Sequence, residues 1–116
     1  MKVYGLTTCR QTQKAMAWLR AQNIAFDYHD YKKAGITREK LLEWDVKLGF
    51  ESFLNKKGSA WKELEDSVKS SVVTSEDAIK LMLDIPRTIK RPAIEDGAFL
   101  YFGFDQAVYE KHFSKP

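Results

Sequence analysis

The first 31 residues combine a strand pattern, a helical pattern and a second strand pattern within a short span of chain. The segment from Lys2 to Leu6 predicts a strand that enters a Thr-Thr turn. From Arg10 to about Gln22 there is no Gly or Pro, and apolar residues recur at helical spacing. The segment from Ile24 to Tyr31 then alternates apolar and polar residues, which predicts a second strand. A strand, a helix and a strand of these lengths form a βαβ unit, whose right-handed crossover makes the two strands parallel.

The middle of the chain predicts three consecutive helices, which we expect to form an insertion over residues 36–86. Thr37 is a suitable N-cap, and the helix that it opens ends at Gly49. A short helix is expected around Trp61. Thr74 opens the third helix, because an acidic residue three positions later can complete a variant of the capping box.

The C-terminal part predicts a hairpin followed by a helix. Two apolar segments, Ile89 to Glu95 and Ala98 to Phe102, are separated by Asp96-Gly97, the strongest short-range signal for a hairpin. Asp105 then caps the last helix. The order is β-α-β, helices, β-β-α. This is the order of a thioredoxin-like α/β fold with a mixed four-stranded sheet and an inserted helical subdomain.

Composition and charge limit the classes of partner. The chain has 116 residues, of which 44% are hydrophobic and 30% charged, so we expect a single domain over residues 1–116. The net charge is +3 and no basic tract reaches five residues, so nothing indicates nucleic acid. No apolar run approaches the ~18 residues of a membrane span, and the start lacks the apolar stretch of a secretion signal. The prediction is a cytoplasmic protein without a membrane partner.

Cys9 is the only cysteine, so no disulfide can form within the chain. It lies in the turn between the first predicted strand and helix. Free N–H groups and the positive end of the helix dipole stabilise a thiolate there and can bind an oxyanion. Thr8 and Arg10 flank Cys9 and are candidate anion-binding residues. The alternative is a small buried cysteine without chemistry, but its position makes a reactive Cys9 the expected state.

Thr12 stands three residues after Cys9, where a dithiol oxidoreductase carries its second cysteine. A reaction cycle therefore cannot close within the chain, and an outside thiol such as glutathione must resolve an adduct on Cys9. The alternative role for Thr12 is a helical hydroxyl bonded to the backbone. No bound cofactor is expected. The two histidines, His29 and His112, lack metal-ligand spacing, so no metal site is predicted.

The dipeptide Arg91-Pro92 falls in the first predicted strand of the hairpin. A proline there requires an edge, a bend or a cis peptide. In a thioredoxin-like arrangement this strand end returns beside the cysteine turn, so we expect the Arg91 guanidinium near the Cys9 thiolate and any anion bound to it. The alternative is a solvated surface arginine. Pro92 is a further candidate for the substrate- or anion-binding site. Lys56 and Lys57 are weaker candidates for an anion clamp, with a solvated pair as the alternative.

The chain resembles the ArsC/Spx family over nearly its whole length, in the segments VYGLTTCRQTQKAMAWL, IAFDYHDYKKAGIT, FLNKKGSAW, IKLMLDIP and IKRPAIE. Its resemblance is closest to the YffB-like branch, which is related to arsenate reductases and described as glutathione-dependent thiol reductases. The resemblance implies a monothiol oxidoreductase. In it the Cys9 thiolate attacks an oxidised sulfur or an oxyanion, Arg91 of the RP motif stabilises negative charge, and glutathione resolves the adduct.

Two departures from the family pattern narrow the expected function. The arsenate reductases hold the oxyanion with further arginines. Here Lys56 and Lys57 stand in place of one, and LYFGF offers no basic residue for another, which argues against arsenate as substrate. The Spx branch consists of regulators that bind RNA polymerase and usually carry a CxxC redox switch, which Thr12 removes here. A regulatory binding module that contacts RNA polymerase without catalysis is the alternative function.

Overall fold

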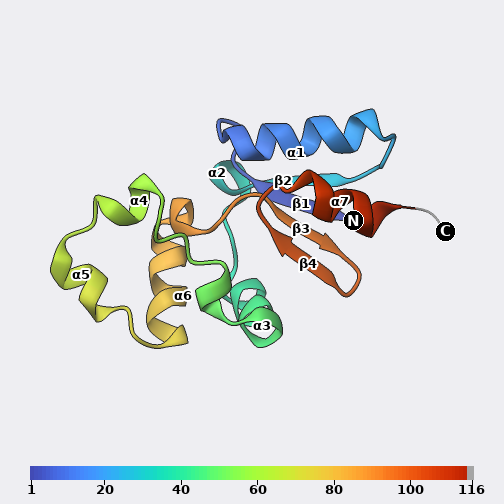
Figure 1. Ribbon diagram of the computed structural model, residues 1–116. Coiled ribbons are helices and arrows are strands. Elements are labelled where there is room, and N and C mark those ends of the chain that lie inside the picture. Colours follow the sequence, from blue (N-terminus) through green and yellow to red (C-terminus); the bar gives the residue numbers. More distant parts are fainter. Residues whose placement is uncertain (115–116) are drawn as a thin grey trace. The chain divides into compact units, whose positions relative to one another are not determined.

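The computed structural model describes residues 1–114 and divides the chain into two compact units (Figure 1). The first unit joins Met1–Asp30 to the C-terminal part of the chain from Arg91 onward. The second unit is Tyr31–Lys90, and the predicted helical insertion over residues 36–86 lies inside it. None of the helices within residues 1–114 has the length and apolar character to cross a membrane.

The first unit contains a mixed four-stranded sheet in the order β2-β1-β3-β4. Strands β1 and β2 are parallel, whereas β1 pairs antiparallel with β3, and β3 with β4. The predicted βαβ unit, the hairpin and the thioredoxin-like α/β class are therefore confirmed. The elements of this unit are β1 (Lys2–Gly5), α1 (Arg10–Ala21), β2 (Asp27–Asp30), β3 (Ala93–Asp96), β4 (Phe99–Phe102) and α7 (Gln106–Phe113).

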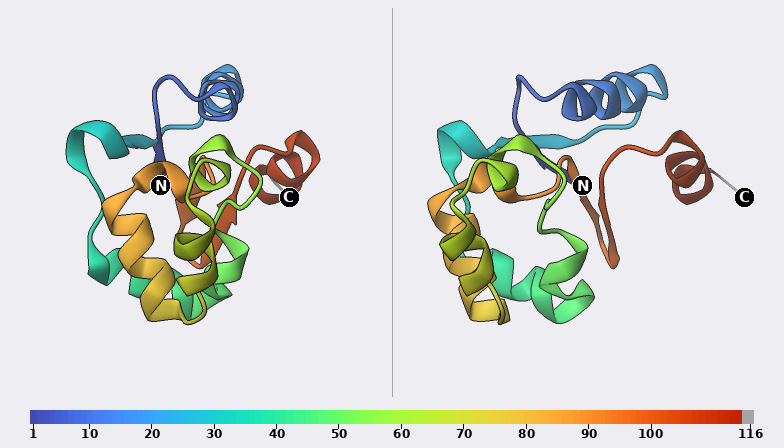
Figure 2. Two further views of the ribbon diagram at one scale, coloured as in Figure 1. Left: turned by 90° about the vertical axis from the view of Figure 1, so that its left-hand side faces the viewer. Right: turned by 60° about the vertical axis from the view of Figure 1, so that its left-hand side comes forward.

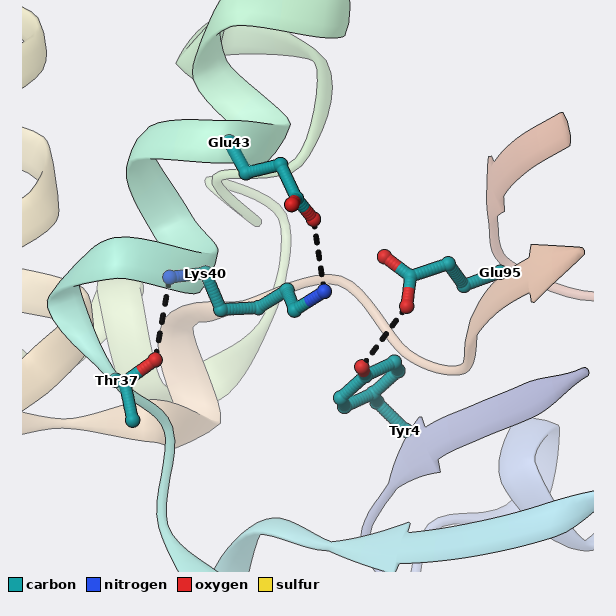
Figure 3. A network of polar contacts seen from close by, with 5 residues as sticks. All are labelled: Tyr4, Thr37, Lys40, Glu43 and Glu95. Carbon is teal, nitrogen blue, oxygen red and sulfur yellow. Dashed lines mark hydrogen bonds and ion pairs between the residues drawn. The ribbon is translucent and has the colours of Figure 1, made fainter. Parts of the chain in front are cut away.

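The core of the first unit lies between one face of the sheet and the helices α1 and α7 (Figure 1). Val3 of β1 is paired with Ile94 of β3, and both side chains are fully buried. They pack with Leu19 of α1 and Tyr109 of α7. Tyr4 and Glu95 are the residues that follow Val3 and Ile94 in the two strands. The Tyr4 hydroxyl donates to Glu95 Oε1 at 3.0 Å and links β1 to β3 (Figure 3).

The second unit is helical. Its buried centre includes Trp44 and Phe53, whose rings meet edge to face, and α3 packs against α6 (Figure 2). Its helices are α2 (Tyr31–Ala34), α3 (Arg38–Leu48), α4 (Ser59–Lys62), α5 (Asp66–Ser71) and α6 (Ser75–Asp84), with short 3-10 turns at Phe50–Ser52 and Pro86–Thr88.

The predicted helix caps are present. The Thr37 hydroxyl accepts a hydrogen bond from the Lys40 backbone N–H at 3.1 Å and opens α3 (Figure 3). Thr74 and Asp77 form a reciprocal capping box at the start of α6. Asp105 accepts backbone hydrogen bonds at the start of α7. Each cap satisfies N–H groups that a helix cannot pair internally.

Two predicted strand boundaries were wrong. Strand β2 begins at Asp27 and not at Ile24, because β1 supplies ladder partners only from Lys2 onward and Lys2 pairs with Asp27. Strand β3 begins at Ala93, so Arg91-Pro92 precedes the strand instead of lying in it. The residues before it are engaged elsewhere, since the Lys90 N–H donates to the Phe53 carbonyl. The short helices α2 and α5 were not predicted.

Candidate functional site

Cys9 occupies the N-cap position of α1, as the sequence predicts. After β1 ends at Gly5, the chain makes a turn that the Cys9 N–H closes by donating to the Leu6 carbonyl at 2.9 Å. The Cys9 carbonyl accepts from the Gln13 N–H at 3.0 Å, the first bond of the helix. The Cys9 side chain is partly exposed and makes no capping hydrogen bond. The Cys9 sulfur is thus held at the N-terminus of a 12-residue helix.

The environment of Cys9 favours the thiolate. Partial burial has the largest single effect and raises the pKa of Cys9, but the other contributions outweigh it and the pKa is lowered. The Thr12 backbone N–H, the Arg91 side chain and the Thr12 hydroxyl lower the pKa, because each is placed to donate a hydrogen bond to the thiolate form of the sulfur. The positive charge of Arg91 adds to them. Donors and a cation around a sulfur lower a thiol pKa because they bind the charged form more strongly.

Sheet register explains how Arg91 reaches Cys9. Ala93 is paired with Tyr4 in the antiparallel ladder between β3 and β1. Residues before Ala93 therefore continue toward the end of β1 from which the Cys9 turn departs. The peptide bond between Arg91 and Pro92 is cis, and the Pro92 carbonyl accepts from the Gly103 N–H at 2.7 Å. The predicted neighbourhood of Arg91 and Cys9 is present, although Arg91 lies just before the strand.

The remaining predicted anion-binding residues differ in their surroundings. Thr8 and Arg10 are exposed on either side of Cys9. Lys56 and Lys57 are also exposed but belong to the second unit, where the Lys56 ammonium lies 5.3 Å from the centroid of the Trp61 ring. A cation over an indole face is a stabilising contact in its own right. A substrate- or anion-binding role for these four residues, and for Pro92, stays a prediction.

Thr12 does more than the sequence indicated. Its side chain is fully buried, and its hydroxyl makes no hydrogen bond to the backbone of residues 1–114, so the alternative role of a backbone-bonded hydroxyl is wrong. The hydroxyl instead stabilises the Cys9 thiolate. A Cβ at Gly5 would lie only 2.5 Å from the Thr12 hydroxyl oxygen. The glycine at the end of β1 therefore leaves the space that Thr12 fills, and Gly5 is the feature of the sequence that indicates this close packing.

The two histidines have structural partners. The His29 ring lies against Tyr4, with centroids 5.0 Å apart. His112 stacks on Phe99, and its Nε2 is 2.9 Å from the Asp96 carboxylate. Within residues 1–114, no three His, Cys, Asp or Glu side chains are grouped so that they could hold a metal ion.

Replacement of Arg91 by alanine should slow alkylation of Cys9 at neutral pH. Loss of the guanidinium removes one hydrogen bond and one positive charge from the thiolate, so the pKa rises toward that of a free cysteine. The alkylation rate at neutral pH then falls by about tenfold for each pH unit of that rise, because the thiolate is the reactive form. The measurement is the pH dependence of iodoacetamide alkylation. Arg91→Lys keeps the positive charge without the planar guanidinium, so its alkylation rate should lie between those of the wild type and Arg91→Ala.

Arg20→Ala is the matched control, because Arg20 lies in the last turn of the same helix and contacts the Phe26 ring. Its pH profile should equal that of the wild type.

The lowered pKa of Cys9 also affects the stability of the folded protein. A lowered thiol pKa stabilises the folded protein at alkaline pH, and this contribution disappears as the pH falls through the folded-state pKa. An Arg91→Ala profile that coincides with the wild type would contradict the assignment of Arg91.

Comparison with known proteins identifies the family of this chain. The sequence matches the ArsC family over residues 4–112. The chain belongs to the ArsC family. An uncharacterized protein of Haemophilus influenzae is 33% identical over 113 residues, covering 97% of each chain. The global transcriptional regulator Spx of Streptococcus mutans is 25% identical, covering 85% of this chain and 72% of the regulator.

Solved structures of ArsC-family proteins have the same fold. The protein named YffB is 36% identical and superimposes with a TM-score of 0.89, covering 95% of this chain and 96% of that chain. An arsenate reductase (ArsC) related protein from Brucella melitensis is 35% identical with a TM-score of 0.77, covering 98% and 94%. The predicted family is therefore confirmed. Its relatives include both reductase-related proteins and transcriptional regulators.

Proposed function

We propose that this ArsC-family protein is a monothiol oxidoreductase that uses glutathione to reduce oxidised sulfur. The observation that carries the proposal is the environment of Cys9, where Thr12 and Arg91 lower the pKa of a partly exposed thiol at a helix N-terminus. A lowered pKa increases the thiolate fraction at neutral pH, and the thiolate is the form that attacks disulfides. The thiol reductases and arsenate reductases that the sequence resembles support this reaction class.

The proposed cycle has two thiol exchange steps. The Cys9 thiolate attacks the glutathione sulfur of a mixed disulfide RS–SG, a bond forms between the two sulfurs, and RS⁻ leaves and takes a proton from solvent. A second glutathione, as its thiolate, then attacks the glutathione sulfur on Cys9, which releases oxidised glutathione and restores the Cys9 thiolate. The net reaction is RSSG + GSH → RSH + GSSG. No second cysteine exists in the chain to resolve the intermediate.

Arg91 and the N-terminus of α1 have a defined part in both steps. Negative charge passes from the attacking sulfur to the leaving sulfur, and these groups stay in place to bind it throughout. Prearranged donors and charges of this kind stabilise a transition state without reorganisation. The same arrangement suits an oxyanion, so arsenate is a narrower version of the proposal. Its test is whether expression protects an arsenate-sensitive host.

The proposal is tested by turnover with a glutathione mixed disulfide, coupled to glutathione reductase and NADPH oxidation. We expect turnover that needs both glutathione and the protein, together with a glutathione adduct at Cys9 visible by intact mass. Turnover supported by a dithiol reductant and not by glutathione would contradict the glutathione dependence. Absence of turnover and of the adduct would contradict the proposed function as a whole.

A second candidate function comes from the relatives named as regulators. Spx proteins of Streptococcus and Lactococcus are 24–25% identical and match 85–90% of this chain. The alternative is a binding module that contacts RNA polymerase without catalysis. A pull-down with tagged protein from the native host tests it. Recovery of polymerase subunits with the tagged protein, together with no turnover in the glutathione assay, would favour this alternative. A pull-down without polymerase subunits would contradict it.

A further inference from the structure

Thr7, two residues before Cys9, is held by hydrogen bonds at both its backbone and its side chain. Its carbonyl accepts from the Gln13 side-chain amide of α1 at 2.8 Å. The Thr7 hydroxyl donates to the Asp30 carboxylate of β2 at 3.1 Å. The Tyr28 hydroxyl lies 3.1 Å from the Thr7 hydroxyl oxygen. The residue thus ties the Cys9 turn to both the helix and the neighbouring strand.

The hydrogen bonds have one consistent direction. The Thr7 hydroxyl has a single proton, and the Asp30 carboxylate only accepts, so that proton goes to Asp30. Tyr28 must then donate to Thr7, and the order is Tyr28 to Thr7 to Asp30. Tyr28 keeps its proton, because burial raises its pKa and the negative charges of Asp30 and Cys9 raise it further.

The register of β2 makes this arrangement possible. Tyr28 is paired with Val3 and Asp30 with Gly5, in the parallel ladder between β2 and β1. Alternate residues of a strand point to the same side of a sheet, so both β2 side chains reach one hydroxyl in the loop that follows β1. Asp30 stands beside the last residue of β1, where the turn toward Cys9 begins.

We infer that Thr7, Tyr28 and Asp30 are positioning residues that clamp the Leu6–Cys9 turn and so hold the Cys9 sulfur over the N-terminus of α1. The inference deepens the proposed function and rests on it for its catalytic consequence. The clamp acts on the nucleophile through the backbone of Thr7. A nucleophile needs such support, because small displacements from its donors are costly in rate.

The test compares variants that remove hydroxyl groups from the clamp. Thr7→Val keeps the shape of the side chain and loses both hydroxyl bonds. We expect its Cys9 alkylation at neutral pH to fall about fivefold, with the pH profile moved to higher pH, because the thiolate fraction sets the rate. Tyr28→Phe loses one bond and should fall about twofold on the same argument. Thr7→Ser restores a hydroxyl and should recover the wild-type profile.

Tyr101→Phe in β4 is the matched control, since it removes a tyrosine hydroxyl in the same unit whose charged neighbour is Asp105. Its pH profile should not move. Thermal unfolding of each variant identifies any that fails to fold, and Tyr28→Phe then decides in place of Thr7→Val. Unmoved profiles in folded Thr7→Val and Tyr28→Phe would overturn the inference.

Glutathione-dependent turnover of the wild type separates the two proposals. If the wild type turns over and the pH profiles of the Thr7 and Tyr28 variants do not move, the proposed function is supported and the clamp is contradicted. Moved profiles in a protein without such turnover would support the clamp and contradict the proposed function. Moved profiles together with a matching loss of turnover would support both.

Discussion

A Cys9→Ser variant should lose glutathione-dependent reductase activity by about a thousandfold or more, because its hydroxyl remains protonated where the thiol ionises. The donors around position 9 lower the pKa of a thiol that is already near the working range. The pKa of a serine hydroxyl lies too far above that range for the same donors to ionise the hydroxyl. The serine oxygen also cannot form the mixed disulfide that the proposed cycle requires. The measurement is NADPH oxidation in the coupled assay.

The control for this variant is its fold. Serine is close to cysteine in size, and Cys9 makes no side-chain cap bond, so the variant should unfold in one transition close to that of the wild type. Because Cys9 is the only cysteine, the variant should also take up no iodoacetamide at a thiol. Turnover at the wild-type rate in a folded Cys9→Ser protein would rule out Cys9 as the nucleophile.

A Gly5→Ala variant should lose both stability and the lowered pKa of Cys9. The new Cβ would lie 2.5 Å from the Thr12 hydroxyl oxygen and 2.7 Å from its methyl carbon, closer than real contacts allow. Gly5 is paired with Asp30 in the sheet and Thr12 is fully buried in α1, so neither can move freely. Overpacking of this kind typically costs about 1–3 kcal/mol. Urea unfolding and the alkylation profile of Cys9 measure the two effects.

A double variant makes this prediction specific. In Gly5→Ala/Thr12→Ala the two clashing atoms of Thr12 are gone, so part of the lost unfolding free energy should return. The pKa of Cys9 should stay raised, because the Thr12 hydroxyl is one of its donors. Thr12→Ala alone supplies the remaining corner of the cycle. Strictly additive losses of stability would mean that Gly5 and Thr12 do not share this space.

Much of the fold followed from patterns that are local in the sequence. The first strand, the helix from Arg10 and the turn at Asp96-Gly97 were predicted correctly, as were the caps Thr37 and Thr74. Caps and tight turns depend on bonds between residues only a few positions apart. The position of Cys9 at a helix start is local in the same sense, which is why a reactive cysteine was predicted from the sequence.

Sequence patterns determined the order of the elements, the two parallel strands and the place of Cys9, whereas the surroundings of the sulfur were decided by the tertiary structure. The register between β1 and β3 places Arg91 beside Cys9, although the two residues are separated by most of the sequence. Pairing of β2 with β1 brings Tyr28 to Thr7, and the close approach of Gly5 to Thr12 leaves a buried hydroxyl beside the thiolate. These contacts join residues far apart in the chain, or on different elements, so their distances depend on strand register and packing, which no local pattern encodes.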